Sequence, residues 1–187
     1  MIYKETYKNL SHGTDEESAK KIKENGFEIR GGCDSWCGKG IYFYDVKKKS
    51  WWAANRKCTE IKRKTGVKIK PFVLFADIID LSDNEIFDMR IYENMCDFER
   101  TVRPFIGKCS MQIANIQDET EKVIKLRTML ISYYILATEK KLVIGNFKQR
   151  PQKKYEHIME FAESLDILFG IETIYCVKDK NIIKNVR

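Results

Sequence analysis

The sequence predicts an α+β protein. Segments typical of strands and of helices are mixed along the chain, without the strict strand–helix alternation of a doubly wound parallel sheet. With 187 residues, 43% of them hydrophobic, the chain is long enough to bury a core without disulfide bonds. It has no internal repeat, low-complexity tract or Gly/Pro-rich linker, so we expect residues 1–187 to form a single domain.

The chain is expected to open with a strand followed by a helix. A strand over 9–12 ends at Gly13, and Thr14 with Glu17 has the spacing of a capping box. Gly26 ends the helix, because glycine readily adopts the backbone conformation found after a helix C-terminus. Strand-to-helix corners of this kind often face ligands.

A Gly-rich loop over 30–38 then leads to a short strand over 40–44. The next segment, 51–64, has the composition of a basic helix that Gly66 ends. Its apolar positions predict an inward face made of Trp51, Trp52, Ala54, Cys58 and Ile61.

The second half of the chain contains a strongly apolar strand, FVLFADII at 72–79. Ser82 and Glu85 form a second capping box, which predicts a helical stretch to about Val102. Four further elements are expected: a helix over 119–140, a strand over 142–147, a helix over 153–165 and a strand over 172–177. The last ten residues, KDKNIIKNVR, are expected to be a polar tail.

The chain is basic, since 34 Lys and Arg residues against 27 Asp and Glu give a formal charge of +7. This balance suits acidic partners such as nucleic acid, a dinucleotide or an anionic surface. Both signs are interspersed, so much of the charge is expected to be ordinary solvated surface. No apolar run reaches the ~20 residues that a membrane-spanning helix needs, so no membrane partner is expected.

Six cysteines, at 33, 37, 58, 96, 109 and 176, are too sparse for a disulfide scaffold, and no apolar signal segment precedes them. We therefore expect reduced thiols and a cytoplasmic protein. Cys33 and Cys37 have the spacing of half a zinc site. A structural zinc site needs four ligands, however, and the chain has two histidines and no second close cysteine pair, so no metal is expected.

The segment Gly38-Lys39-Gly40 is not a dinucleotide fingerprint of the GxGxxG kind. It follows a loop and precedes a strand, whereas a Rossmann site follows a strand and opens a helix. The chain has no Walker A sequence either, which argues against a kinase or a nucleotide hydrolase.

Five features of the first 50 residues have a joint spacing: His12-Gly13-Thr14, Gly26-Phe27, Gly38-Lys39-Gly40, Ile41-Tyr42-Phe43 and Ser50. Residues 38–43 read GKGIYF, and Ser50 follows Tyr42 by eight positions. This set resembles the NAD-binding core of the ADP-ribosyltransferase fold, in the branch of the poly(ADP-ribose) polymerases and diphtheria-toxin-like enzymes with a His-Tyr-Glu motif. The strong resemblance covers about residues 11–54.

The resemblance implies a fold with split mixed or antiparallel sheets around an NAD cleft with flanking helices. It also implies an NAD-dependent mono-ADP-ribosyltransferase, which cleaves the nicotinamide–ribose bond of its co-substrate NAD and transfers ADP-ribose to protein or nucleic acid. Small domains of this type are often toxins or defence effectors, so an antitoxin or inhibitor protein is a further expected partner.

Carried over by motif, the catalytic residues are expected to be His12, Tyr42 and Glu172. The expected cofactor contacts are His12, Gly13, Thr14, Gly40, Tyr42, Ser50 and Trp52. These residue types suit NAD: an aromatic ring can stack on nicotinamide, a glycine backbone and a hydroxyl can bind its carboxamide, and a histidine can bind the adenosine ribose. Lys39 or Arg30 is the candidate for neutralising the diphosphate.

Glu172 is chosen because the late strand ETIYC resembles the family's strand that begins with the catalytic glutamate. Glu119 and Glu121 are the next candidates. The family's second stacking tyrosine, eleven positions after the first, is Ala53 here, which weakens any claim to polymer synthesis. Trp52 or Trp51 can take that role, or the nicotinamide ring is stacked on one face only.

Other interpretations stay open. Tyr42 can be core packing, and Ser50 can be a helix N-cap. The segment 47–64 combines lysines with tryptophans as single-stranded nucleic-acid binders do, but its tryptophans can equally be core and its lysines a solvated face. Two alternative functions are a catalytically silent NAD- or nucleic-acid-binding module and an RNA 2′-phosphotransferase.

Overall fold

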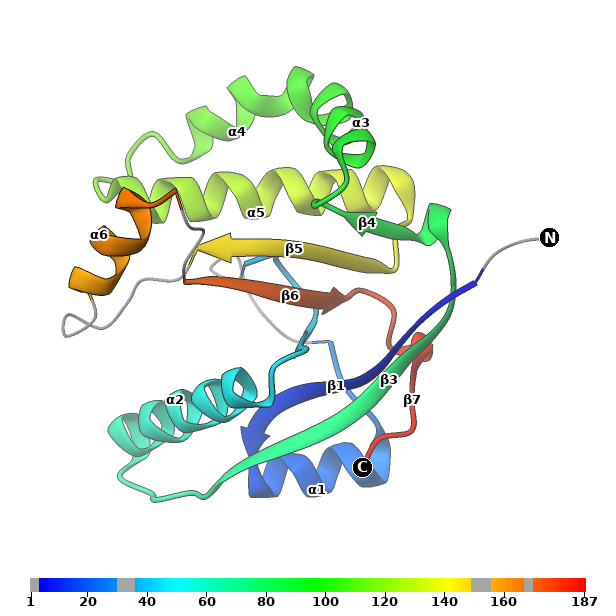
Figure 1. Ribbon diagram of the computed structural model, residues 1–187, viewed down its shortest axis with the longest axis vertical. Helices are drawn as coiled ribbons and strands as arrows, with labels where there is room; N and C mark the ends of the chain where they lie inside the picture. Colours follow the sequence, from blue (N-terminus) through cyan, green and yellow to red (C-terminus); the bar gives the residue numbers. More distant parts are fainter. Residues whose placement is uncertain (1–3, 30–35, 149–155, 167–169) are drawn as a thin grey trace.

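The computed structural model describes residues 4–29, 36–148, 156–166 and 170–187. Its seven strands form one mixed sheet in the order β4-β5-β6-β2-β1-β3-β7, in which only the β4–β5 pair is parallel (Figure 1). The strands are β1 (Lys4–Asp15), β2 (Ile41–Tyr44), β3 (Pro71–Ser82), β4 (Ile86–Asp88), β5 (Leu142–Lys148), β6 (Ile171–Val177) and β7 (Ile183–Lys184). The α+β class predicted from the sequence is confirmed.

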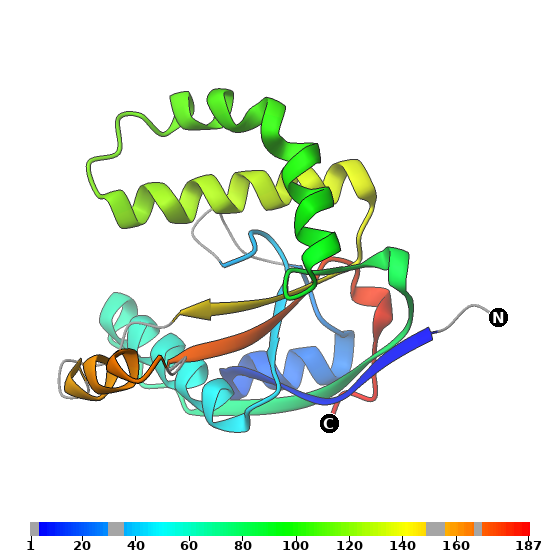
Figure 2. The same ribbon diagram turned by 45° about the horizontal axis from the view of Figure 1, so that its top comes forward.

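Five of the helices lie in two groups. Helix α5 lies beside β5 with α3 and α4 packed against it, whereas α1 and α2 lie against β1 and β3 (Figures 1 and 2). Their bounds are α1 (Glu16–Asn25), α2 (Lys47–Thr65), α3 (Tyr92–Val102), α4 (Ile106–Gln112), α5 (Glu119–Thr138) and α6 (Glu156–Ser164). Within the part of the chain that the structure covers, no helix is both long and apolar enough to cross a bilayer.

The two halves of the sheet are joined at one point. Strand β1 pairs with β3 over most of its length, but it pairs with β2 only through Ser11 and Tyr44. Alternate residues of the central strands face two separate buried clusters. Phe43 and Tyr175 belong to the first, and Tyr44 and Ile174 belong to the second. The junction between β1 and β2 therefore lies between two cores.

The helix after β1 begins one residue later than predicted. Thr14 is still part of β1, where it pairs with Phe72, and the N-cap is Asp15, whose carboxylate accepts a hydrogen bond from the Ser18 amide at 2.8 Å. The predicted capping box of Thr14 and Glu17 is therefore wrong, because the strand pairing extends through Thr14. Gly26 ends α1 as predicted, with φ 78° and its amide donating to the Ile22 carbonyl.

Helix α2 begins at Lys47, and its predicted inward face is confirmed only at Ala54 and Cys58. Its buried residues are Ser50, Ala54 and Cys58, spaced by four. Trp51 and Trp52 are 39% and 48% exposed, so their predicted inward position is wrong. The large side chains lie outside because the close approach of α2 to β1 leaves room only for small residues.

The second capping box forms, but it opens only a single 3-10 turn. The Ser82 hydroxyl and amide both contact the Glu85 carboxylate, at 2.7 and 3.0 Å. The chain then enters β4, where Ile86 and Phe87 are buried, and α3 begins at Tyr92. The predicted continuous helix to Val102 is wrong because the apolar pair is drawn into the sheet beside β5.

The predicted polar tail is also wrong. Ile182 and Ile183 are buried, and β7 pairs with Asp77 and Ile78 of β3. Arg187 exchanges two backbone hydrogen bonds with Phe75. The C-terminal segment thus completes one edge of the sheet.

Candidate active site

The three predicted catalytic residues lie on the three neighbouring strands at the centre of the sheet, His12 on β1, Tyr42 on β2 and Glu172 on β6. Tyr42 is opposite Cys176 in the β2–β6 register, so alternation along β6 puts Glu172 on the same face as Tyr42. His12 faces the other side, next to Phe43. The site therefore has two parts, one on each side of the β1–β2 junction.

His12 is a neutral hydrogen-bond acceptor at the edge of this junction. Its Nδ1 lies 2.8 Å from the Tyr42 carbonyl oxygen, which can only accept, so Nδ1 carries the proton. Burial and the Lys57 charge lower the pKa of His12 to about 4, against the opposing effect of that hydrogen bond. At neutral pH the ring is uncharged, and Nε2 is left to accept a hydrogen bond.

A cavity of about 290 Å³ lies beside His12, bounded by α1, β1 and β2. Four of the predicted cofactor contacts line it: His12, Thr14, Gly40 and Tyr42. Phe27 adds an aromatic wall, with its ring centroid 5.2 Å from that of His12. The cavity thus combines this apolar wall with the polar side chains of His12, Thr14, Ser18, Asn25 and Glu28.

Three charged residues line the cavity: Lys21, Lys57 and Glu28. The Lys57 ammonium lies 2.7 Å from the Asp15 carboxylate and 2.8 Å from the Thr14 hydroxyl. Burial alone would raise the pKa of Asp15, but the hydrogen bonds from Lys57 and Ser18 hold it well below its usual value. Asp15 is therefore ionised at neutral pH and anchors Lys57 at the cavity.

Gly13 and Ser50 lie where α2 meets β1, and neither lines the cavity. A Cβ at Gly13 would be 1.9 Å from the Ser50 carbonyl oxygen and 2.9 Å from the Ala54 amide nitrogen. The Ser50 hydroxyl is buried and donates to the Ser11 hydroxyl at 2.8 Å. Ser50 lies inside α2, whose N-cap is Val46, so the alternative of a helix N-cap is wrong.

Tyr42 is held at its hydroxyl end by the turn that precedes β2. The hydroxyl donates to the Gly38 carbonyl and accepts from the Cys37 amide at 3.1 Å. Burial and the neighbouring thiols of Cys37 and Cys176 raise its pKa, so the phenol stays protonated. Gly40 permits this packing, because a Cβ there would be 2.4 Å from the Cys176 sulfur.

Glu172 is only 8% exposed and forms an ion pair with Lys49 in the first turn of α2. Burial of Tyr44 and, to a smaller extent, the negative charge of Glu172 raise the pKa of Tyr44 to about 12. Glu172 does not line the cavity beside His12. Sequence reasoning included Lys49 in the basic segment 47–64 but did not pair it with Glu172, because 123 residues separate the two.

The other predicted positions lie apart from the cavity. Glu119 and Glu121 are on the exposed first turn of α5, where they pair with Lys122 and Lys125. The Trp52 ring is half-exposed and lies under the Arg56 guanidinium, 5.5 Å away. Lys39 is exposed, and its carbonyl accepts from Lys178 at 2.7 Å. Arg30 and Cys33 lie outside the described residues.

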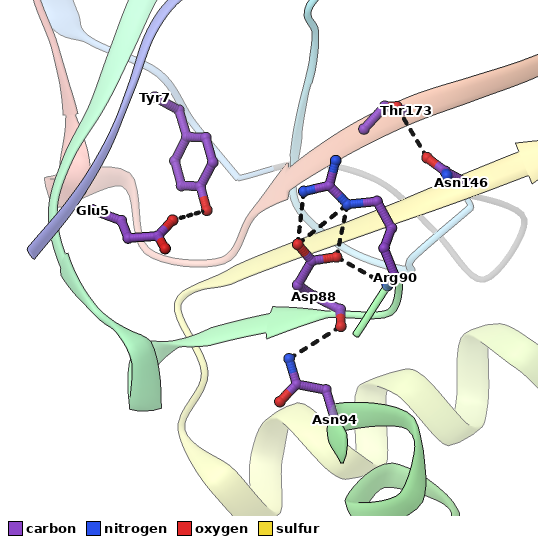
Figure 3. Close-up of polar contacts among 7 residues, drawn as sticks. All are labelled: Glu5, Tyr7, Asp88, Arg90, Asn94, Asn146 and Thr173. Carbon is purple, nitrogen blue, oxygen red and sulfur yellow. Dashed lines mark hydrogen bonds and ion pairs between the residues drawn. The ribbon is translucent and has the colours of Figure 1, made fainter. Parts of the chain in front are cut away.

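Sequence reasoning missed a polar cluster between β1 and β4 (Figure 3). The Arg90 guanidinium binds both oxygens of the Asp88 carboxylate, at 2.7 to 3.2 Å, and the Asn94 amide donates to the Asp88 carbonyl at 3.1 Å. Tyr7, hydrogen-bonded to Glu5, comes from β1. Only the spacing of Asp88 and Arg90 could have signalled this cluster, since the remaining parts come from distant segments.

Comparison with known proteins identified no relative of this chain. The chain matches no protein-family model, no curated protein and no solved structure.

Proposed function

We propose that the protein is an NAD-dependent mono-ADP-ribosyltransferase that transfers ADP-ribose to a macromolecular acceptor. The observation that carries this proposal is that His12, Tyr42 and Glu172 lie on three neighbouring strands, in a chain whose residues 38–43 read GKGIYF. His12 and Glu172 are 160 positions apart, so nothing in the local sequence requires them to flank the same strand.

The cavity beside His12 suits the nucleoside end of NAD. Phe27 lines the cavity and supplies an apolar contact for the adenine base, and His12 Nε2 can accept a hydrogen bond from a ribose hydroxyl. Lys21 and Lys57 offer ammonium groups to the diphosphate. At about 290 Å³ the cavity holds only part of a dinucleotide, so the nicotinamide end has to extend beyond it.

Glu172 supplies the chemistry that bond cleavage needs. NAD brings an ADP-ribosyl group with nicotinamide as its leaving group, and positive charge develops on the ribose as the bond breaks. A buried carboxylate stabilises such charge and can take the proton of the incoming acceptor. The ion pair with Lys49 holds the Glu172 side chain in one orientation before substrate binds.

Nicotinamide release from labelled NAD, measured with protein, RNA and DNA pools as acceptors, tests the proposal. We expect Glu172→Gln to lower kcat by about 100-fold or more, because one charge-stabilising group is removed. His12→Ala should mainly raise KM, and Tyr42→Ala should abolish transfer. Glu119→Gln, which changes an exposed carboxylate on α5, is the matched control and should leave the rate unchanged.

Two results would contradict this assignment: no nicotinamide release by the wild type with any acceptor, or full activity of Glu172→Gln. A catalytically silent NAD-binding module is the second candidate, and it is favoured by the separation of Glu172 from the cavity. Calorimetric binding of NAD without turnover would identify that module.

A further inference from the structure

Helix α2 carries the whole net charge of the protein. It contains six lysines and two arginines against one glutamate, Glu60, so its formal charge of +7 equals that of the full chain. The remaining 26 basic and 26 acidic residues balance one another. The basic character of the sequence is therefore local to one element.

The outer face of α2 combines these cations with exposed aromatic rings. Ser50, Ala54 and Cys58 face β1, which turns Trp51 and Trp52 toward solvent at 39% and 48% exposure. Exposed cations flank them at Lys48, Arg56, Lys62 and Arg63. In the described part of the chain, Lys48, Lys62 and Arg63 form no ion pair.

This face is next to Glu172. Lys49, one residue before buried Ser50, forms the ion pair with Glu172, and the Arg56 charge partly opposes the rise in the pKa of Tyr44 that burial and Glu172 cause. Figures 1 and 2 both show α2 beside the end of the sheet where β6 begins. A polymer lying on α2 would therefore pass the proposed catalytic carboxylate.

We propose that single-stranded nucleic acid binds along the outer face of α2 and supplies the acceptor for ADP-ribosylation. Unpaired cations bind phosphates, and exposed tryptophan rings stack on unpaired bases. A duplex keeps its base faces covered, so its bases cannot stack on Trp51 or Trp52. The combination on α2 therefore fits a single strand best.

The acceptor step rests on the proposed function. A nitrogen of an unpaired base attacks C1′ of the nicotinamide ribose, forming a new C–N bond. The bond from C1′ to nicotinamide breaks, its electron pair returns to the pyridine ring, and neutral nicotinamide leaves. The proton of the attacking nitrogen passes to the Glu172 carboxylate.

Fluorescence anisotropy with labelled single-stranded RNA, single-stranded DNA and duplex DNA over a range of salt tests binding without NAD. We expect the single strands to bind in preference to the duplex. The triple variant Lys48→Ala/Lys62→Ala/Arg63→Ala should reduce the slope of log K against log salt by about 2, since three phosphate contacts are lost. Trp51→Ala should weaken binding about 5-fold or more through the loss of base stacking.

The matched control is Lys8→Ala/Lys108→Ala/Lys180→Ala, which removes three exposed lysines from other elements and should change neither slope nor affinity. Circular dichroism and urea unfolding establish that each variant is folded. Transfer of labelled ADP-ribose to the same strands should fall in parallel with their binding to the α2 variants.

Strand labelling that is unchanged in the α2 variants would overturn the inference. So would nicotinamide release with protein acceptors and no binding of nucleic acid, a result that leaves the proposed function standing. Strand binding without nicotinamide release under any condition would instead overturn the proposed function and with it the acceptor role.

Discussion

His12 shows how its surroundings determine the chemistry of a single residue. Its ring is packed against Phe27 and Phe43, and Lys57 adds a nearby positive charge. Both effects disfavour the imidazolium form, which gives a folded-state pKa of about 4 against 6.5 for the free side chain. The uncharged ring is the form that can accept a hydrogen bond from a ribose hydroxyl.

This shift predicts a pH dependence of stability. Between pH 6.5 and 4 the unfolded chain binds a proton at His12 that the folded chain does not, so stability falls as the pH decreases. The contribution is fully present above pH 6.5, and its complete loss costs up to about 3 kcal/mol. Urea unfolding at pH 7 and pH 4.5 should show a smaller decrease for His12→Gln than for the wild type.

His157, an exposed residue on α6, provides the control for this experiment. The His157→Gln variant should keep the wild-type decrease in stability. An equal decrease in His12→Gln and in the wild type would show that the pKa of His12 is the same in the folded and unfolded chains.

At the scale of elements, the contact between β1 and α2 depends on one glycine. A Cβ at Gly13 would overlap the backbone of α2 at Ser50 and Ala54, which a side-chain rotation cannot relieve. Gly107 in α4 has nothing within 4 Å of such a Cβ. The two glycines therefore differ in the space around them: a side chain fits at Gly107 and does not fit at Gly13.

We expect opposite effects from the same substitution at these positions. Gly13→Ala should lower the free energy of unfolding by about 3 kcal/mol or more, because α2 has to move away from β1. Gly107→Ala should raise it by up to about 1 kcal/mol, because alanine favours the helix. Urea unfolding measures both, and an equal effect of the two changes would contradict the close contact.

The sequence predicted the type of most elements. It failed where packing against other elements decided which residues are buried. The four-residue spacing of Ser50, Ala54 and Cys58 was present in the sequence, yet the larger Trp51 and Trp52 were expected to be inside. Only small residues fit between α2 and β1, so packing overruled hydrophobicity. Ile86 and Phe87 likewise joined a strand in place of a helix.

At the scale of the whole molecule, the C-terminal segment adds the edge strand β7 to the sheet. Ile183 is buried in the first core beside β3, and the Asp77 carboxylate accepts from Asn185 at 2.8 Å. Arg187 pairs with Phe75 through its backbone. These contacts bring residues more than 100 positions apart into one core.

Ile183→Ala is therefore expected to lower the free energy of unfolding by about 2–5 kcal/mol through the cavity it leaves. Ile171→Ala, at a 39% exposed position on β6, is the matched control and should have a much smaller effect. Thermal and urea unfolding compare the two variants. A negligible effect at Ile183 would mean that the tail does not form part of the core in solution.

The sequence by itself determined the α+β class, the GKGIYF motif with its spaced serine, and His12, Tyr42 and Glu172 as candidates. These features depend on local periodicity and on short-range spacing, which a linear chain displays. Only the tertiary structure decided that Lys49 meets Glu172, that His12 is neutral, and that the charge of α2 faces solvent. Each of these depends on contacts between distant segments, and their energies depend on burial that no local pattern contains.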